Sequence, residues 1–355
     1  MNNTFDRLNN YCKYKSIQII VENETIKEKY FVSLQINYSD FIINGLVAFI
    51  DTQGLITKLK SDSLLSVVIT DPMGNTYIND FVIISSKKLE TGKSTLTQLN
   101  FIDQISYFLQ KLYINNAFKS VDLTKLATSY INSLRPILDK QKIKLDIQSN
   151  PIILNNFTIS QRMPLLNVLL NEISKQGSYI YQDKLLIRLC ELSEIDAGFS
   201  KFFYSQNAGE FSANLILDAR FNAGNENTAA TISPKGEIKV FNQSLKRFEK
   251  VEVQNDLVNT ETKQRDYGNK IIQKADYANN SLNLVVPHLF KNTLEVVVPG
   301  NFKNLKLFNH VYLMFDTNFF KNKGIDSLDG EYVIYSLDDL IIPNYHITRL
   351  KCYKI

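Results

Sequence analysis

The chain has 355 residues, which is long enough for two or three domains of ordinary size. Hydrophobic residues make up 44% of it and charged residues 21%, so it is not a disordered acidic or basic tail protein. The formal net charge of +4 is small for this length and does not indicate a dedicated duplex-binding surface. Glycine and proline are too few for a collagen-like or linker-like chain.

The three cysteines, Cys12, Cys190 and Cys352, are far apart and lack the spacing of a paired site. We therefore expect no disulfide framework, no thiolate metal site and synthesis in a reducing compartment. No apolar run reaches 18 residues, so no membrane-spanning helix is expected. The polar segment 1–10 also lacks the apolar centre of a secretory signal.

The first 100 residues have the pattern of short β-strands. Strands are predicted for four segments, 18–21, 64–70, 77–85 and 94–101. Residues 31–38 alternate with period two, which indicates a strand with one buried face. Asn44 and Gly45 lie between two apolar runs and predict a two-residue hairpin turn. A second turn is predicted at 71–75. This spacing favours a small antiparallel barrel or sandwich.

The pattern becomes helical near residue 101. Apolar residues recur at helical spacing over three segments, 101–113, 123–134 and 161–176. Asp122 or Ser120 is the expected N-cap of the second helix, and Pro136 is expected to end it near Arg135. A compact α/β unit is completed by a predicted strand and a predicted hairpin, 142–148 and 179–189.

The remainder of the chain again has the pattern of strands. They are predicted at 211–221, 229–232, 237–241, 294–298, 311–316, 331–337 and 345–353. Residues 243–283 are polar with few apolar anchors, which indicates an insertion, partly helical over 266–277.

We therefore expect an α+β, mostly β fold with two antiparallel β-barrels and an α/β insert between them. The first barrel is assigned to residues 1–100 and the insert to residues 101–190. The second barrel is discontinuous, and the polar insertion interrupts it. Its two parts and the insertion are assigned to 191–242, 284–355 and 243–283.

No motif for chemistry is complete. Residues 91–95 resemble the end of a phosphate-binding loop, but Lys87 stands where the first glycine of that loop belongs. The segment also lies between two predicted strands and does not open a helix, so a hairpin turn is expected. The three histidines, His288, His310 and His346, have no partner at metal-ligand spacing. His346 lies in an alternating strand, where a structural role is expected.

Acidic residues are likewise interpreted as structural. Residues 326–331 lack the alternating oxygen ligands of a calcium loop and are expected to form a surface turn. Asp51, Asp338 and Asp339 are interpreted as turn residues at strand ends. We therefore assign no catalytic, metal-binding or cofactor-binding residue and expect no cofactor.

Lysines gather in three groups, Lys58 with Lys60, Lys87 with Lys88 and Lys93, and Lys140 with Lys142 and Lys144. With many tyrosines and phenylalanines nearby, they leave open a stacking surface for single-stranded nucleic acid. The outward face of a barrel explains them equally directly, and we prefer that interpretation.

Three stretches carry a resemblance to a known family: 101–134, 157–189, and 329–334 with 345–353. In the second, a helix leads through a glycine into a hairpin that begins with aromatic residues. The chain resembles the baseplate hub proteins of contractile phage tails, related to the late-control tail proteins and to the N-terminal half of type VI secretion spikes. The resemblance covers about two-thirds of the chain, and residues 243–283 have no counterpart in it.

The resemblance implies two similar, tail-tube-like barrels in each chain, so that a homotrimer presents six. Such a hub adapts the sixfold tail tube to a trimeric spike and frames a polar genome channel that contacts DNA weakly. The implied partners are further copies of the chain, the spike, the tail tube, other baseplate proteins and passing DNA. The implied location is the tail baseplate of the virion, after synthesis in the host cytoplasm. The implied role is structural, not enzymatic. The alternatives are a module that binds single-stranded nucleic acid or glycan, and a tail-borne enzyme that degrades cell walls.

Overall fold

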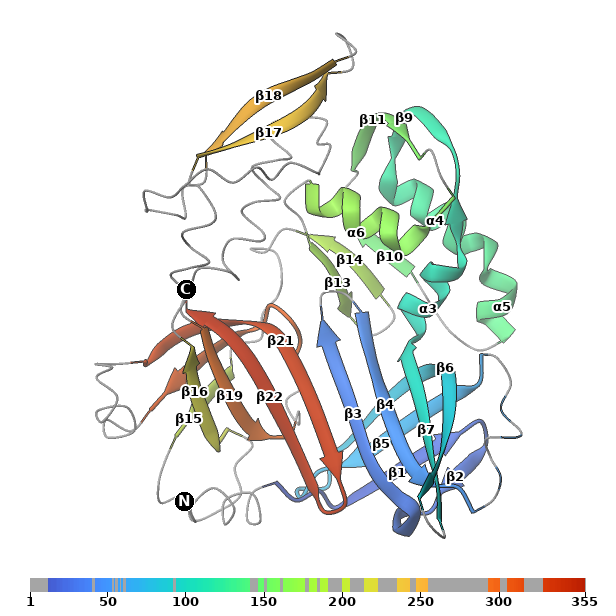
Figure 1. Ribbon diagram of the computed structural model, residues 1–355, viewed down its shortest axis with the longest axis vertical. Coiled ribbons are helices and arrows are strands. Elements are labelled where there is room, and N and C mark those ends of the chain that lie inside the picture. The colour runs from blue at the N-terminus through green and yellow to red at the C-terminus, as the bar shows by residue number, and fades with distance from the viewer. Residues whose placement is uncertain are drawn as a thin grey trace. The chain divides into compact units, whose positions relative to one another are not determined.

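The computed structural model describes residues 12–39, 42–52, 54, 57, 59, 62–91, 94–140, 146–149, 152–159, 162–175, 179–183, 186–190, 200–204, 214–222, 235–242, 247–254, 293–300, 305–315 and 328–354. The chain divides into two compact units (Figure 1). The first comprises Met1–Tyr107, Ala197–Phe221 and Leu294–Ile355, and the second comprises Phe108–Asp196 and Asn222–Thr293.

One large sheet dominates the first unit. Its first half contains β1 (Ser16–Val21), β2 (Glu24–Ile26), β3 (Phe31–Ser39), β4 (Ile42–Ile50), β5 (Leu64–Thr70), β6 (Thr76–Thr91) and β7 (Ser94–Asp103). Its second half contains β15 (Ser200–Phe203), β16 (Asp218–Asn222), β19 (Thr293–Pro299), β20 (His310–Met314), β21 (Gly330–Ile342) and β22 (Tyr345–Lys354). A short 3-10 helix, η1 (Glu28–Tyr30), lies between β2 and β3.

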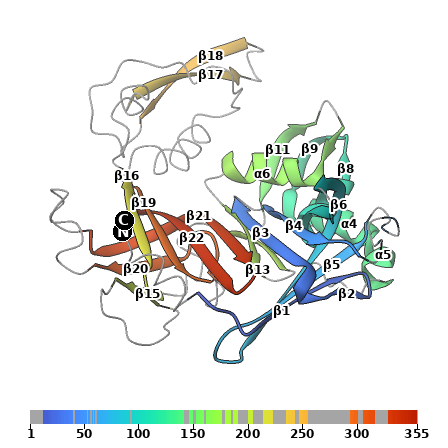
Figure 2. The same ribbon diagram turned by 60° about the horizontal axis from the view of Figure 1, so that its bottom comes forward.

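The strands follow the order β16-β19-β22-β21-β3-β4-β7-β6-β5-β1-β2, with β20 beside β21 and β15 beside β20. The two halves meet where β21 pairs antiparallel with β3, from Leu337 opposite Tyr38 to Ile341 opposite Leu34 (Figures 1 and 2). Ile341 is fully buried and belongs to the core of the first half. The expected mostly β, antiparallel character is confirmed, whereas the described strands of this unit form one extended sheet with no closed barrel among them.

The core of the first half covers one face of this sheet. Alternate residues of β1 and β5 are buried, as period-two strands require. The expected alternation of residues 31–38 holds only in part, because a β-bulge near Phe31 shifts the phase. Phe31 is therefore buried with Leu34 and Ile36, while Val32 is partly exposed.

The hairpin turn predicted at Asn44 and Gly45 is wrong, because both residues lie inside β4. A Cβ on Gly45 would lie 2.1 Å from the Gln35 carbonyl oxygen and 2.5 Å from the Phe101 ring. The glycine therefore permits close packing at this point of the sheet and does not make a turn. The chain reverses earlier, since Ser39 pairs with Ile42.

The β6–β7 and β21–β22 hairpins repeat the same register. Val82 pairs with Ile102, and 251 residues later Val333 pairs with Tyr353. Each hairpin has a bulge, between Ile83 and Ser85 in the first and between Ile334 and Ser336 in the second. Beyond the bulge, residues 85–91 pair with 100–94, and residues 336–342 pair with 351–345.

The strand before each hairpin is placed in the same way. β5 pairs with β6 from Leu64 opposite Val82, and β20 pairs with β21 from His310 opposite Val333. The backbone N–H of Ile83 donates to the carbonyl of Ser63, and that of Ile334 donates to the carbonyl of Asn309. The two halves of the sheet thus contain the same three-stranded unit. We name its two copies the first and second repeats.

The second unit contains most of the helices. Its described elements are β8 (Tyr113–Ile114), β9 (Ala117–Asp122), α4 (Leu123–Ser133), α5 (Arg135–Lys140), β10 (Asp146–Ser149), β11 (Ile153–Thr158), β12 (Met163–Pro164), α6 (Leu165–Lys175), β13 (Tyr179–Asp183), β14 (Leu186–Cys190), β17 (Lys235–Asn242) and β18 (Arg247–Gln254). Helix α3 (Gln104–Lys111) spans the boundary between the units.

The predicted helix ends hold in part. Asp122 is confirmed as the N-cap of α4, since its carboxylate accepts from the backbone N–H groups of Thr124 and Lys125. Pro136 lies in the first turn of α5, where a proline is tolerated. The predicted start of the first helix at residue 101 is wrong, because the buried residues Phe101 and Ile102 extend β7.

Several predicted segments lie outside the described residues. These are the helix at 266–277, the strand at 229–232 and the first parts of the strands at 142–148 and 211–221. Within the polar insertion, β18 pairs antiparallel with β17. The 179–189 hairpin is confirmed by β13 and β14.

Candidate functional site

The face of the sheet opposite the core carries uncharged amide and hydroxyl side chains. The core of the first half takes the side chains of Leu34, Val47 and Leu99 from β3, β4 and β7. The alternate residues of these strands therefore point to the other face. We call that surface the amide face; its polar members are Ser33, Gln35, Asn37, Asn44, Gln98 and Asn100.

Hydrogen bonds join these side chains to one another. The Gln35 amide donates to Asn37 at 3.0 Å, and the Asn37 amide donates to Asn44 at 3.4 Å. The Asn100 amide donates to the Ser85 hydroxyl of β6 at 2.8 Å. Of the outward-facing side chains described on β3, β4 and β7, none carries a charge. The surface therefore offers hydrogen bonds without ion pairs.

Charged residues flank the amide face on the neighbouring strands. Lys87 lies on β6, and Asp338 and Arg349 lie on β21 and β22. The Arg349 guanidinium contacts the Glu295 carboxylate at 3.1 Å. Burial raises the pKa of the Asp338 carboxyl, and the positive charges of Lys351 and Arg349 oppose that rise.

Asp338 and Asp339 do not lie at a strand end, so that prediction is wrong. Both lie inside β21, where the strand is longer than its apolar pattern indicates. Asp339 is buried and accepts a hydrogen bond from the Thr348 hydroxyl, and its carboxylate lies 3.3 Å from Nε2 of His346. His346 is buried in an alternating strand as expected, and its backbone N–H donates to the carbonyl of Cys12.

Cys12 and Cys352 are buried thiols. Cys12 and Cys352 are free, and burial raises the pKa of the Cys12 thiol to about 12 and that of Cys352 still further. Thiolate is the nucleophilic form, so neither residue is activated for chemistry. Cys190 lies in β14. His310 contacts Glu331 at 2.7 Å on the surface, and His288 lies outside the described residues.

The remaining sequence candidates have structural positions. β6 ends at Thr91 and β7 begins at Ser94, and the two strands pair as a hairpin, as expected at this point of the chain. Lys87 and Lys88 are exposed on β6, and the other lysine groups fall largely outside the described residues. In the acidic turn, the Asp329 carboxylate accepts from the backbone N–H of Phe315.

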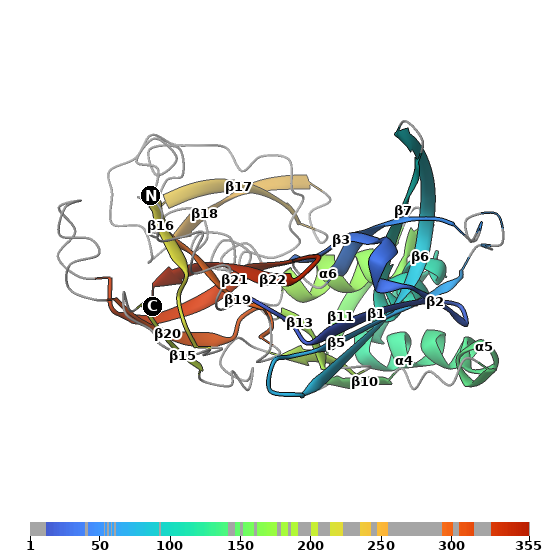
Figure 3. The same cartoon turned by 90° about the horizontal axis from the view of Figure 1, so that it is seen from below.

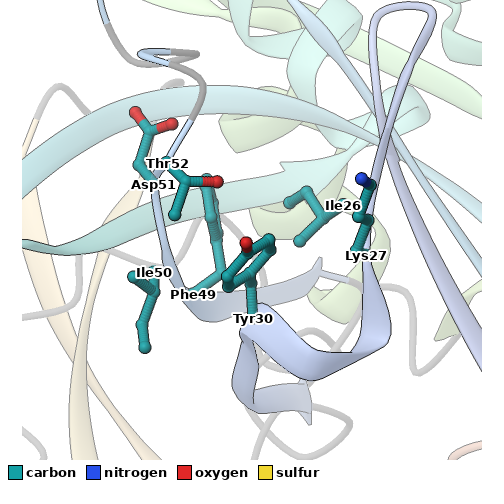
Figure 4. A pocket seen from close by; sticks show the side chains of 7 residues that line it. All are labelled: Ile26, Lys27, Tyr30, Phe49, Ile50, Asp51 and Thr52. Carbon is teal, nitrogen blue, oxygen red and sulfur yellow. The ribbon is translucent and has the colours of Figure 1, made fainter.

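A shallow surface pocket lies beside η1 (Figure 4). It is lined by Ile26, Lys27, Tyr30, Phe49, Ile50, Asp51 and Thr52. Hydrogen bonds from Lys29 and Thr52 lower the pKa of the Tyr30 hydroxyl. The space that it encloses is about 10 Å³, far below the roughly 300 Å³ at which ordinary small-molecule sites begin, so the pocket does not suit a nucleotide or another large cofactor.

The described residues contain no cluster of His, Cys, Asp or Glu side chains that could hold a metal ion. None of their helices combines the length and apolar character needed to cross a membrane.

Two tail proteins of known structure are similar to this chain. The tail protein from Neisseria meningitidis MC58 superimposes with a TM-score of 0.63 and 12% identity, covering 97% of each chain. The 43 kDa tail protein of prophage MuSo2 from Shewanella oneidensis gives 0.59 and 14%, covering 95% of this chain and 97% of that one. The expected resemblance is thereby confirmed as a likeness of fold. This chain has the fold of phage tail proteins.

A secretion-system protein shares the fold. The E. coli c3393 protein, a type VI secretion component described as structurally similar to the T4 tail proteins gp27 and gp5, gives a TM-score of 0.54. Its identity to this chain is 8%, over 97% of this chain and 76% of that one. No protein-family model matches the sequence, and no curated protein does.

Proposed function

We propose that the protein is a structural component of a phage tail baseplate, a central hub that forms a trimeric ring. The observation that carries this proposal is the repeated hairpin, 81–103 and 332–354, within one sheet. A chain that contains the same unit twice lets three copies present six equivalent units. A ring of this kind matches a sixfold tail tube on one side and a trimeric spike on the other.

The two repeats belong to two tail-tube-like domains in this proposal. The boundaries remain those expected from the sequence: 1–100 and 191–242 with 284–355 for the two domains, 101–190 for the insert and 243–283 for the polar insertion. The halves join through the β21·β3 pair. Each half becomes a barrel-like segment of the ring.

The amide face lines the genome channel in the assembled hub. Asn and Gln side chains hydrogen-bond water and phosphate oxygens but release no counterions, so they bind DNA weakly. DNA held by many lysines would resist passage because each phosphate contact adds affinity. The uncharged character of Gln35, Asn37 and Asn100 supports this role.

The role is structural, not enzymatic. The His346–Asp339 pair is buried away from solvent, and Cys12 and Cys352 are protonated thiols in the core. The protein works in the virion, bound to the spike, the tail tube and other baseplate proteins.

The mass and shape of the purified protein test the proposal. Light scattering is expected to give a trimer of the 355-residue chain, alone or with its spike, and electron microscopy a ring with an open axis. Antibody labelling is expected to place it at the end of the tail. A protein that stays monomeric with and without tail components, and is absent from purified particles, would contradict the proposal.

A further inference from the structure

The two repeats differ in what lies beyond their hairpins. In the second repeat, residues 337–341 of β21 pair with β3. The matching residues of the first repeat are 86–90 of β6, which follow the same bulge and the same register. Among the described residues, this part of β6 pairs with β7 on one side and with no strand on the other, because β5 ends its pairing at Val82.

The hairpin that carries this edge extends beyond its neighbours. Figure 3 shows the tip of the β6–β7 hairpin standing clear of the other strands of the first unit. Five successive residues, 84–88, are exposed, so neither face of this stretch is covered by the described residues. An exposed strand edge of this length is a template for a further strand.

The other end of the sheet supplies a matching edge. In the first half, strand β7 of the hairpin is followed in the sheet by β4 and then β3. In the second half, strand β22 of the hairpin is followed in the same way by β19 and then β16. β16 therefore occupies in the second half the position of β3 in the first. β16 is the terminal strand of the described sheet, so one of its edges has no neighbouring strand there.

We propose that β16 of one copy pairs with residues 86–90 of β6 in the next copy. This joint reproduces between chains the antiparallel β3·β21 joint found within the chain. It rests on the proposed ring and specifies how the copies join. Each copy contributes one β6 edge and one β16 edge, so the contact is head-to-tail and can close into a ring.

The chemistry of the two edges suits their different tasks. Asp338 and Asp339 of β21 are matched by Lys87 and Lys88 of β6, and Ile341 is matched by Glu90. The joint inside the chain is permanently covered and includes the buried Ile341, whereas the matching residue of the β6 edge is the charged Glu90. Charged side chains keep a free strand edge soluble until its proper partner arrives.

Hydrogen exchange on the intact protein tests the joint. Amide exchange of residues 86–90 and 218–222 is expected to slow by about tenfold or more in the trimer relative to dilute monomer. Residues 337–341 are the internal control, because their β3 partner is present in both states. A trimer that leaves 86–90 unprotected would overturn the joint while leaving the ring intact. If no trimer forms under any condition, the proposed function fails with it.

Cross-linking gives a second, independent measurement. Copies carrying Ser86→Cys are mixed with copies carrying Arg220→Cys, both in a Cys190→Ser background, and treated with a short bis-maleimide. Both positions are exposed, so the fold tolerates the changes. A cross-linked dimer band is expected. The control replaces Ser86→Cys by Ile78→Cys. Ile78 is 64% exposed and lies on the part of β6 that pairs with β5, so this variant is expected to give no cross-linked dimer. Equal cross-linking from both positions would contradict the joint.

Discussion

Thr97 and Thr348 stand at the same position of the two repeated hairpins, yet their hydroxyl groups have different surroundings. Both side chains are fully buried. The Thr348 hydroxyl donates to Asp339, whereas the Thr97 hydroxyl has no hydrogen-bond partner among the described residues. The residue that matches Asp339 in the first repeat is Lys88, whose side chain is exposed.

This difference predicts that the same threonine-to-valine substitution affects stability differently at the two positions. Thr348→Val removes the hydroxyl that donates to the buried Asp339 carboxylate and is expected to cost about 1–3 kcal/mol of unfolding free energy. Thr97→Val removes an unpartnered polar group and is expected to leave stability unchanged or slightly higher. Urea denaturation of the two variants measures both values. Equal losses would show that the Asp339–Thr348 bond has no special weight.

Gly45→Ala is expected to destabilise the first half of the sheet. The new methyl group would meet the Gln35 carbonyl at 2.1 Å, and backbone at that distance must move. The expected loss is about 1–3 kcal/mol or more, as for other overpacked sites. Gly74→Ala is the control, because open space surrounds that glycine and only its φ of +94° is unfavourable. A thermal scan in which Gly45→Ala is the milder change would contradict the packing explanation.

Asp338→Asn is expected to change how stability depends on pH. Burial raises the folded-state pKa of Asp338 above its ordinary value of 3.8, so the folded protein favours the protonated carboxyl. The stability that this raised pKa contributes to the folded protein is fully present below pH 3.8 and is lost as the pH rises through the raised pKa. The variant should therefore be more stable than the parent at pH 7, and the difference should shrink towards pH 3.5. Chemical denaturation at several pH values tests this, and a constant difference would disprove it.

Asp122→Ala is expected to lower stability by about 1 kcal/mol, because it removes the N-cap of α4. Asp122→Asn keeps an acceptor and should cost little. Asp139→Ala, at an exposed position of α5, is the charge-matched control. Circular dichroism through a denaturant titration gives the comparison. Losses from Asp139→Ala as large as those from Asp122→Ala would point to charge and not to the cap.

Lysines on the amide face are expected to convert weak DNA contact into salt-sensitive binding. Asn37→Lys with Asn100→Lys should raise duplex affinity, and log affinity should fall with log salt by about 0.9 for each phosphate contacted. Fluorescence anisotropy at low and high salt measures this. Met73→Lys with Thr25→Lys adds the same charge at exposed positions elsewhere and serves as the control. Equal gains in DNA affinity from both pairs would contradict the proposal that the amide face lines the channel.

The sequence predicted best where burial alternates regularly. The strand at 64–70 matches β5, and Asp122 is the N-cap of α4. Prediction failed where tertiary packing overrides a local signal. The Asn44–Gly45 pair has the composition of a turn, but the neighbouring Phe101 ring and Gln35 carbonyl require a glycine inside a strand.

The amide face and the repeat were harder to predict. Residues 31–38 identify Gln35 and Asn37 as one face of a strand, but their alignment with Asn44 and Asn100 depends on pairing between distant strands. The repeat is difficult to detect in the sequence because residues 81–103 and 332–354 are identical at only six aligned positions. In the first repeat these are Val82, Ile83, Ser85, Leu89, Thr97 and Leu99. Their common register is a property of backbone pairing, which composition does not reveal.

The β21·β3 pair inside the chain also bears on the size of any assembly. If neighbouring molecules pair through the same strand geometry, the angle between two chains equals the angle between the two halves of one chain. The geometry of the β21·β3 pair in a single folded chain then determines the circumference of the ring.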